Sequence, residues 1–162
     1  KIRYAAKGLI IHNKDKSKFL IIKNRITTPV KNQFTEWDLP GGKIEQAESE
    51  HQALIREIKE ETGLDISIIK GQENAIGTYW FITQNNHKII CKVFTCNQPQ
   101  DNTNEINMNK NPSQTEELIE SKWVTKEEFL LPEYNTANKS LKDMIKNICL
   151  VKNDQANKPI TR

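Results

Sequence analysis

A short helix rich in glutamate, with a glycine near each end, is predicted in the segment from Gly42 to Leu64. Ser49 is a residue type that caps helix N-termini, and Gln52 three residues later completes a capping box. Gly63 stands where a helix commonly ends with one residue in the left-handed conformation. The sequence therefore predicts a helix that begins after Ser49 and ends at Gly63.

Three glutamates of this helix share one face, because Glu57, Glu60 and Glu61 stand at positions i, i+3 and i+4. Like charges at this spacing destabilise an isolated helix by roughly 0.2–0.5 kcal/mol per pair. Glu60 and Glu61 also fall in the last turn, where the helix dipole disfavours anions. A solvated face, the usual explanation of a charge run, would not favour acids at that end. We therefore expect an external cation, and a hard divalent ion is the simplest candidate.

The segment also resembles the signature of the Nudix hydrolases, G-x5-E-x7-R-E-U-x-E-E-x-G-U, where U is bulky and apolar. The matching positions are Gly42, Glu48, Arg56, Glu57, Ile58, Glu60, Glu61, Gly63 and Leu64. The preceding Trp-Asp-Leu-Pro-Gly at 37–41 is similar to the lead-in common in that family. The chain is thus identified as MutT-like, and the resemblance implies an α/β/α sandwich with a mixed central sheet and a catalytic loop–helix–loop.

The resemblance implies a metal site for Mg²⁺, with Mn²⁺ as an alternative. Glu57 and Glu61 are the expected direct ligands, with Glu60 beside them. Glu48 approaches the same face from the preceding loop, and the backbone at Gly42 completes the expected set. Mg²⁺ binds oxygen ligands and combines a few carboxylates with water and substrate phosphates.

The implied reaction is hydrolysis of a diphosphate linkage, in which the metal neutralises phosphate charge and activates water. The expected catalytic residues are Glu57, Glu60, Glu61, Arg56 and Glu117. Arg56 is expected to orient a carboxylate. The general base stays open between Glu60 and glutamates in or beside a distant polar loop, namely Glu105, Glu116 and Glu117.

Substrate contacts are expected from Gly41 and Gly42, whose backbone can come close to phosphate. Arg25, in a basic loop with Lys23 and Lys31, could meet phosphate oxygens, and a solvated basic loop is the alternative. Trp37 could stack on a base or pack in the core, and Tyr79 could contact substrate or be an ordinary strand tyrosine.

Among substrates, a nucleoside triphosphate, damaged or not, is favoured, with the monophosphate and pyrophosphate as products. ADP-ribose and dinucleoside polyphosphates are the alternatives, and a non-catalytic nucleotide-binding module is a rival of another class. The complete set of glutamates argues against that rival.

Apolar runs predict the remaining elements. We expect strands at 4–13, 19–23, 37–39, 66–69, 76–83, 88–96 and 121–125. Ala53, Leu54 and Ile58 should form the buried stripe of the glutamate helix. Thr125, with Glu128, should cap a short helix, and a C-terminal helix over 136–151 should bury an apolar face. Residues 24–36 and 97–115 are expected to be loops.

The composition is that of one polar globular domain, expected over residues 1–151 with a polar tail at 152–162. No apolar stretch is long enough for a membrane span. A net charge of +3 does not favour duplex nucleic acid as a partner, although it suits a small polyphosphate. Three cysteines without framework spacing are expected to be free buried thiols in the cytoplasm. The chain could be a monomer or a homodimer.

Overall fold

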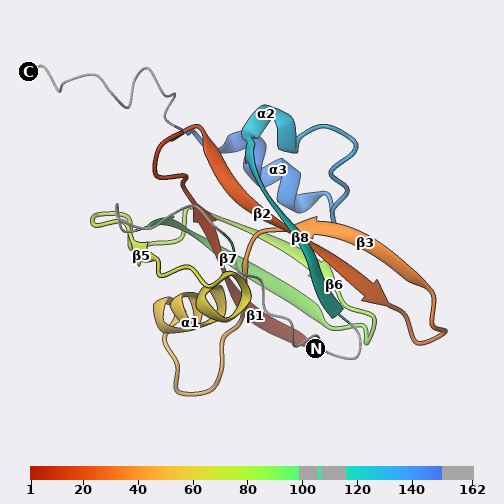
Figure 1. The fold of residues 1–162 in the computed structure, drawn as a ribbon. Helices are drawn as coiled ribbons and strands as arrows, with labels where there is room; N and C mark the ends of the chain where they lie inside the picture. The colour runs from red at the N-terminus through yellow and green to blue at the C-terminus, as the bar shows by residue number, and fades with distance from the viewer. Residues whose placement is uncertain (99–105, 107–115, 151–162) are drawn as a thin grey trace, which may run out of the picture.

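The computed structural model describes residues 1–98, 106 and 116–150 (Figure 1). Eight strands and three helices occur in this part of the chain. They are β1 (Ile2–Ile10), β2 (Lys18–Thr27), β3 (Gln33–Asp38), β4 (Gly41–Lys43), α1 (Glu50–Thr62), β5 (Ser67–Ile68), β6 (Gly77–Ile82), β7 (Lys88–Asn97), β8 (Glu116–Thr125), α2 (Lys126–Phe129) and α3 (Ser140–Asn147).

The strands form two sheets. In the larger sheet the order is β4-β1-β7-β5, with β6 also paired to β7. β1 and β7 run parallel and the other pairs are antiparallel, so this sheet is mixed, as predicted. The smaller sheet has the order β3-β2-β8 and is antiparallel. With α1 at one side and α2 and α3 at the other, the predicted α/β character is confirmed (Figure 1).

Each helical layer has its own hydrophobic core. Ala53, Leu54 and Ile58 of α1 are fully buried with residues of β1 and β7, which confirms the predicted stripe. Leu141 and Ile145 of α3 pack in a second cluster with residues from both sheets. The two clusters hold α1 and the smaller sheet in fixed positions on the larger sheet.

The helix boundaries follow the predicted caps. Ser49 accepts a hydrogen bond from the Gln52 backbone at 3.1 Å, and the Gln52 side chain accepts one from the Ser49 backbone at 2.9 Å. Gly63 ends α1 with φ of 77°. Thr125 and Glu128 form the same reciprocal box at the start of α2. These contacts confirm both predicted capping boxes.

Some element bounds differ from the expectation. The predicted loop at 24–36 is instead the tip of a β2–β3 hairpin with six paired positions. Cross-strand pairing continues through its polar residues, because the pairing is made by backbone groups and does not require apolar side chains. The strand predicted at 121–125 begins at Glu116, since it pairs with β2 along most of its length. The C-terminal helix is shorter than 136–151, because Ile148 has an extended backbone.

The remaining expectations concern the tail, the long loop, the cysteines and a membrane span. The tail at 152–162 and most of the predicted loop at 97–115 lie outside the described residues. Cys91 and Cys96 are buried free thiols, as predicted, whereas Cys149 is exposed. Among the described residues, no helix combines the length and apolar character needed to cross a membrane.

Candidate active site

A cleft of about 1270 Å³ lies between the β2–β3 hairpin and the turn that joins β6 to β7. Glu57 and Glu61 of α1 line it, together with Gly41 and Gly42 of β4. These four residues include the two expected direct metal ligands and the two glycines expected to approach phosphate. The structure therefore brings the central part of the predicted site to one open surface.

The peptide of Gly41 is held from both sides. Its N–H donates to Oε1 of Glu61 at 2.7 Å, and its carbonyl accepts from Nζ of Lys7 at 3.3 Å. Gly41 has a φ of 133°, and a Cβ there would lie 2.1 Å from the carbonyl oxygen of Ala6. Only glycine fits this position, since the backbone of β1 runs directly against it.

Gly42 makes room for a carboxylate. A Cβ at this residue would lie 2.5 Å from Cδ of Glu57 and within 2.8 Å of both its oxygens. The missing side chain of Gly42 is thus the space in which the Glu57 carboxylate sits.

Glu61 is an acid in an unfavourable place for a negative charge. Burial raises the pKa of Glu61 to about 8, and the nearby Glu57 and Asp38 carboxylates add to the shift. The Lys7 ammonium and the Gly41 N–H oppose it without cancelling it. A cation bound at this carboxylate would favour the ionised form.

Arg56 connects the glutamates instead of facing the cleft. Its guanidinium donates to Glu48 at 2.6 and 2.9 Å, to Glu57 at 3.0 Å and to Glu60 at 3.4 Å. The hydrogen bond from Arg56 lowers the pKa of Glu48 to about 2, and the same contact raises the pKa of Arg56. This geometry suits the orienting role expected of Arg56.

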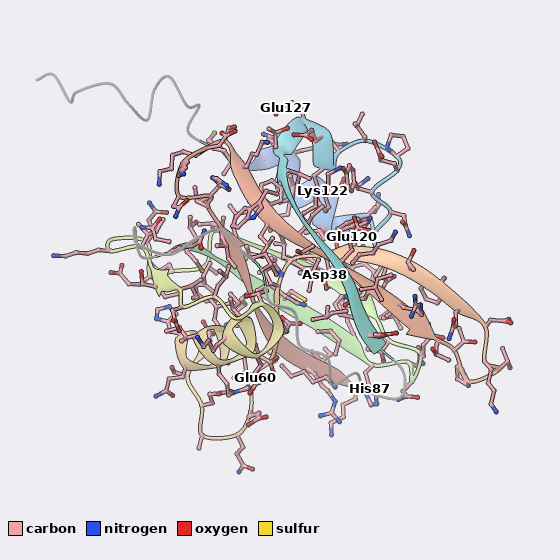
Figure 2. The ribbon with its side chains drawn as sticks, viewed as in Figure 1. Asp38, Glu60, His87, Glu120, Lys122 and Glu127 are labelled. Atoms are coloured by element: carbon pink, nitrogen blue, oxygen red, sulfur yellow. The ribbon has the colours of Figure 1, made fainter. Side chains whose placement is uncertain are left out.

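The five expected metal-site residues do not all converge. Glu48 is engaged by Arg56, and Glu60 lies at the outer edge of α1 with its side chain 53% exposed (Figure 2). Within the described ranges, no three histidine, cysteine or acidic side chains gather closely enough to hold a metal by themselves. Beside the Gly41–Gly42 backbone the cleft places two carboxylates of α1, Glu57 and Glu61, which is a number that Mg²⁺ commonly takes from a protein.

Three expected substrate contacts lie elsewhere. Trp37 is 5% exposed and packs edge-on against Tyr134 with ring centroids 5.5 Å apart, so the structure places this side chain in the core. Arg25 does not line the cleft, because its Nη1 is paired with Oε2 of Glu117 at 2.6 Å. Tyr79 is buried in the core, where its hydroxyl donates to Asp38.

The positions of the loop glutamates do not identify the general base. Glu117 is held in the ion pair with Arg25, and its side chain is 45% exposed. Glu105 and the side chain of Glu116 lie outside the described residues. The choice between Glu60 and a loop glutamate therefore stays a prediction.

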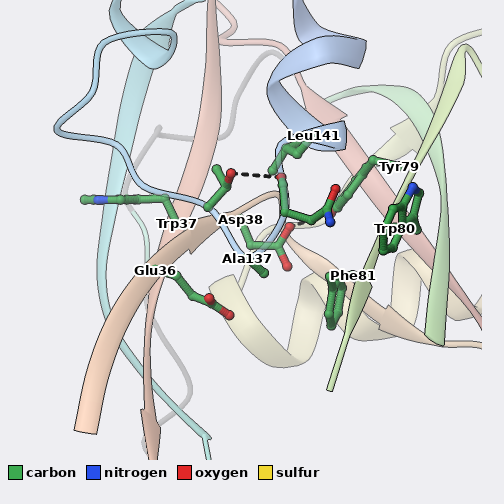
Figure 3. Close-up of a pocket in the computed structure, with 10 residues that line it drawn as sticks. Glu36, Trp37, Asp38, Tyr79, Trp80, Phe81, Ala137 and Leu141 are labelled. Carbon is green, nitrogen blue, oxygen red and sulfur yellow. Dashed lines mark hydrogen bonds between the residues drawn. The ribbon is translucent and has the colours of Figure 1, made fainter. Parts of the chain in front are cut away.

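A buried polar network in the wall of the cleft was not predicted. Asp38 accepts hydrogen bonds from Nζ of Lys7 at 3.0 Å, from the Leu39 N–H at 2.8 Å and from the Tyr79 hydroxyl. Asp38 and Tyr79 are labelled in Figure 3. Burial disfavours the charge of Lys7, but Asp38, followed by Cys91 and Glu61, outweighs it and raises the pKa of Lys7. Burial, with Asp38 next, raises the pKa of Tyr79. The available signal was a lone lysine inside the apolar run of β1.

Comparison with known proteins identifies the family of this chain. The NUDIX domain profile matches residues 2–146, so the chain belongs to the Nudix family. A stretch of 31 residues is 52% identical to the 8-oxo-dGTP diphosphatase of Proteus vulgaris. That stretch covers 19% of this chain and 28% of the relative.

Solved structures show the same fold. The MutT protein from Methanosarcina mazei Go1 superposes with a TM-score of 0.65 at 24% identity, over 98% of this chain and 96% of the other. The MutT Nudix hydrolase from Burkholderia pseudomallei gives 0.62 at 19% identity, over 92% and 99%. The Ap4A hydrolase from C. elegans gives 0.62 at 19% identity, over 89% and 93%. At these identities the likeness concerns the fold alone.

Proposed function

We propose that this chain is a pyrophosphohydrolase, a hydrolase of acid anhydrides, which hydrolyses a nucleoside triphosphate to the monophosphate and pyrophosphate with the help of Mg²⁺. The observation that carries the proposal is the cleft in which Glu57, Glu61 and the Gly41–Gly42 backbone share one wall. The 31-residue likeness to an 8-oxo-dGTP diphosphatase favours a nucleoside triphosphate over other diphosphates.

The residues present fit a divalent cation. Glu57 and Glu61 supply carboxylate oxygens on one surface, and the raised pKa of Glu61 marks a carboxyl whose ionised form lacks a sufficient positive partner. When bound, Mg²⁺ supplies charge neutralisation for phosphates and activates water. Mn²⁺ is the proposed alternative, because it also binds oxygen ligands.

The remaining residues of the site orient these groups. Arg56 holds Glu57 and Glu48, and so limits the rotamers that the Glu57 carboxylate can adopt. Gly42 gives that carboxylate its space, and Glu61 fixes the Gly41 peptide. The proton acceptor is proposed to be Glu60 or Glu117, and a comparison of Glu60→Gln with Glu117→Gln decides between them. The variant that loses kcat while its affinity for Mg²⁺ stays unchanged identifies the base.

A substrate panel tests the proposal. The purified protein is offered nucleoside triphosphates, ADP-ribose, dinucleoside polyphosphates and a nucleotide sugar, each with Mg²⁺ and with a chelator. We expect the highest kcat/KM on a nucleoside triphosphate, pyrophosphate as product and no turnover with the chelator. A higher kcat/KM on ADP-ribose or a dinucleoside polyphosphate would overturn the substrate, and full turnover with the chelator would overturn the metal.

We also propose that the enzyme acts in the cytoplasm, because its three free cysteines suit a reducing compartment. Reactivity of Cys149 with a thiol reagent in freshly lysed cells, without prior reduction, would support this. Light scattering of the purified chain decides between the monomer and the homodimer.

A further inference from the structure

One side chain in the cleft has an unmet hydrogen-bonding need. Asn24 of β2 is 4% exposed, and its Oδ1 has no hydrogen-bond partner among the described residues. Buried polar atoms are nearly always satisfied, so such an atom calls for an explanation. Asn24 also lines the cleft that contains Glu57 and Glu61. A ligand in this cleft can therefore supply the missing donor.

The neighbour of Asn24 adds a second acceptor. Glu36 of β3 stands directly opposite Asn24 in the antiparallel register, and both residues line the cleft. Residues paired in this way place their Cβ atoms about 5 Å apart on one face of the sheet. An ionised glutamate only accepts hydrogen bonds, as does the amide oxygen of asparagine. The two side chains thus present oxygen atoms to the same part of the cleft.

Apolar groups flank this polar pair. Phe34, 40% exposed, is paired with Ile26, two residues beyond the Asn24–Glu36 pair along the hairpin. Both Phe34 and Ile26 line the cleft. Phe81 of β6 borders the same region as Glu36 (Figure 3). Aromatic and aliphatic surfaces around a few polar atoms are typical of sites that hold a planar ring.

We infer that Asn24, with Glu36 beside it, is a specificity-determining residue that reads the edge of a guanine-type base. Guanine carries two adjacent donors, the N1–H and the exocyclic amine, which match two neighbouring acceptors. Adenine and cytosine each place a single amine beside a ring acceptor, and thymine places one N–H between two carbonyl oxygens. The inference rests on the proposed function and specifies the base of its substrate.

The test compares bases that differ by single groups. Values of kcat/KM are measured for dGTP, for dITP, which lacks the exocyclic amine, and for dATP. We expect the wild-type protein to favour dGTP over each of the others by about tenfold, the usual value of a well-placed base contact. In Asn24→Leu this preference should fall to less than about threefold. Equal kcat/KM for the three substrates in the wild-type protein would overturn the inference.

A matched control separates this role from a structural one. Asn97→Leu makes the same substitution on β7, at an exposed residue that does not line the cleft, and should leave the preference for dGTP unchanged. If Asn24→Leu does not fold, Asn24→Ser is measured instead, because it removes the amide without adding an apolar group. An unchanged preference in a folded Asn24 variant contradicts the assignment.

Binding of the product keeps the inference distinct from the proposed hydrolysis. Calorimetric titration with dGMP and dAMP requires no turnover, so it can be performed even if no triphosphate is hydrolysed. Tighter binding of dGMP by the wild-type protein, lost in Asn24→Leu, supports the reading of guanine. Equal affinities in the wild-type protein overturn it, whether or not the enzyme hydrolyses triphosphates.

Discussion

Gly41 lies between two charged regions whose residues are distributed differently along the sequence. On one side is the face of α1, where Glu61 accepts the Gly41 N–H. On the other is the network of Lys7, Asp38 and Tyr79, in which Lys7 donates to the Gly41 carbonyl. The α1 face comes from one short segment, whereas the network joins β1, β3 and β6, separated by 31 to 41 positions in the sequence.

The two regions also differ in how well their charges are compensated. Asp38 has three hydrogen-bond donors, one of them a buried ammonium, and is satisfied by the protein alone. Glu61 has one backbone donor, and the pKa of its carboxyl is raised to about 8. We call the network closed, because its charges are compensated within the protein. The α1 face is open, because its Glu61 carboxylate is not fully compensated and can bind a ligand. Each prediction below perturbs one region and asks whether the other responds.

Lys7→Met should have the largest effect, and on stability. The Asp38 carboxylate, 15% exposed, would lose its cation, and breaking one partner of a buried pair typically costs about 3–5 kcal/mol. Urea unfolding measures this loss. Lys126→Met, at a lysine whose Nζ donates to the Ile148 carbonyl, is the control and should cost less than about 1 kcal/mol. A cost below about 1 kcal/mol for Lys7→Met would show that the network is not closed.

Glu57→Gln and Glu61→Gln should reduce activity instead. Each removes a charge from the open face, and we expect kcat/KM with Mg²⁺ to fall by more than about 100-fold. Circular dichroism should remain that of the wild-type protein. Glu127→Gln, on the exposed surface of α2, serves as the control. Full activity in either cleft variant would refute the proposed metal site, and unfolding of both would show that the face is structural.

The contrast also explains what could be predicted from the sequence. The caps at Ser49 and Gly63, the buried stripe and the glutamate spacing are local patterns, so α1 was predicted with its bounds. The resemblance extended that prediction to the fold. Trp37, in contrast, could not be assigned from its neighbours in sequence, because its burial depends on Tyr134, nearly a hundred positions away.

The other unpredicted features have the same origin. The pairing of β2 with β3 and β8 decides that Asn24 faces the cleft and that Arg25 faces Glu117. A bulge at Lys23/Asn24 shifts this register, and no local signal marked it. Side-chain direction on a strand reverses with a shift of one residue. The face on which each side chain of the polar hairpin lies could therefore not be predicted without knowing the residues with which it pairs.

The stability of the metal-free protein should depend on pH through Glu61. The folded protein keeps a proton on this carboxyl up to about pH 8, whereas the unfolded chain releases it near the ordinary pKa of 4.5. Stability therefore falls as pH rises between these values, by at most about 1.4 kcal/mol per pH unit. Unfolding in a chelator at pH 6 and pH 8 measures the slope. Glu61→Gln should flatten it, and an unchanged slope would assign the dependence to another group.

Tyr79→Phe should have the smallest effect. It tests how much the Tyr79 hydrogen bond contributes to holding Asp38, compared with the ion pair to Lys7. The variant removes one donor to Asp38 and leaves Lys7 and the Leu39 N–H in place, so the expected cost is about 1.5 kcal/mol in urea unfolding. The hydroxyl stays protonated because its pKa is raised, and the cost should not vary with pH below 9. Activity with Mg²⁺ should change little, since Lys7 still holds the Gly41 carbonyl. A cost equal to that of Lys7→Met would mean that the hydrogen bond, and not the ion pair, holds Asp38 in the closed region.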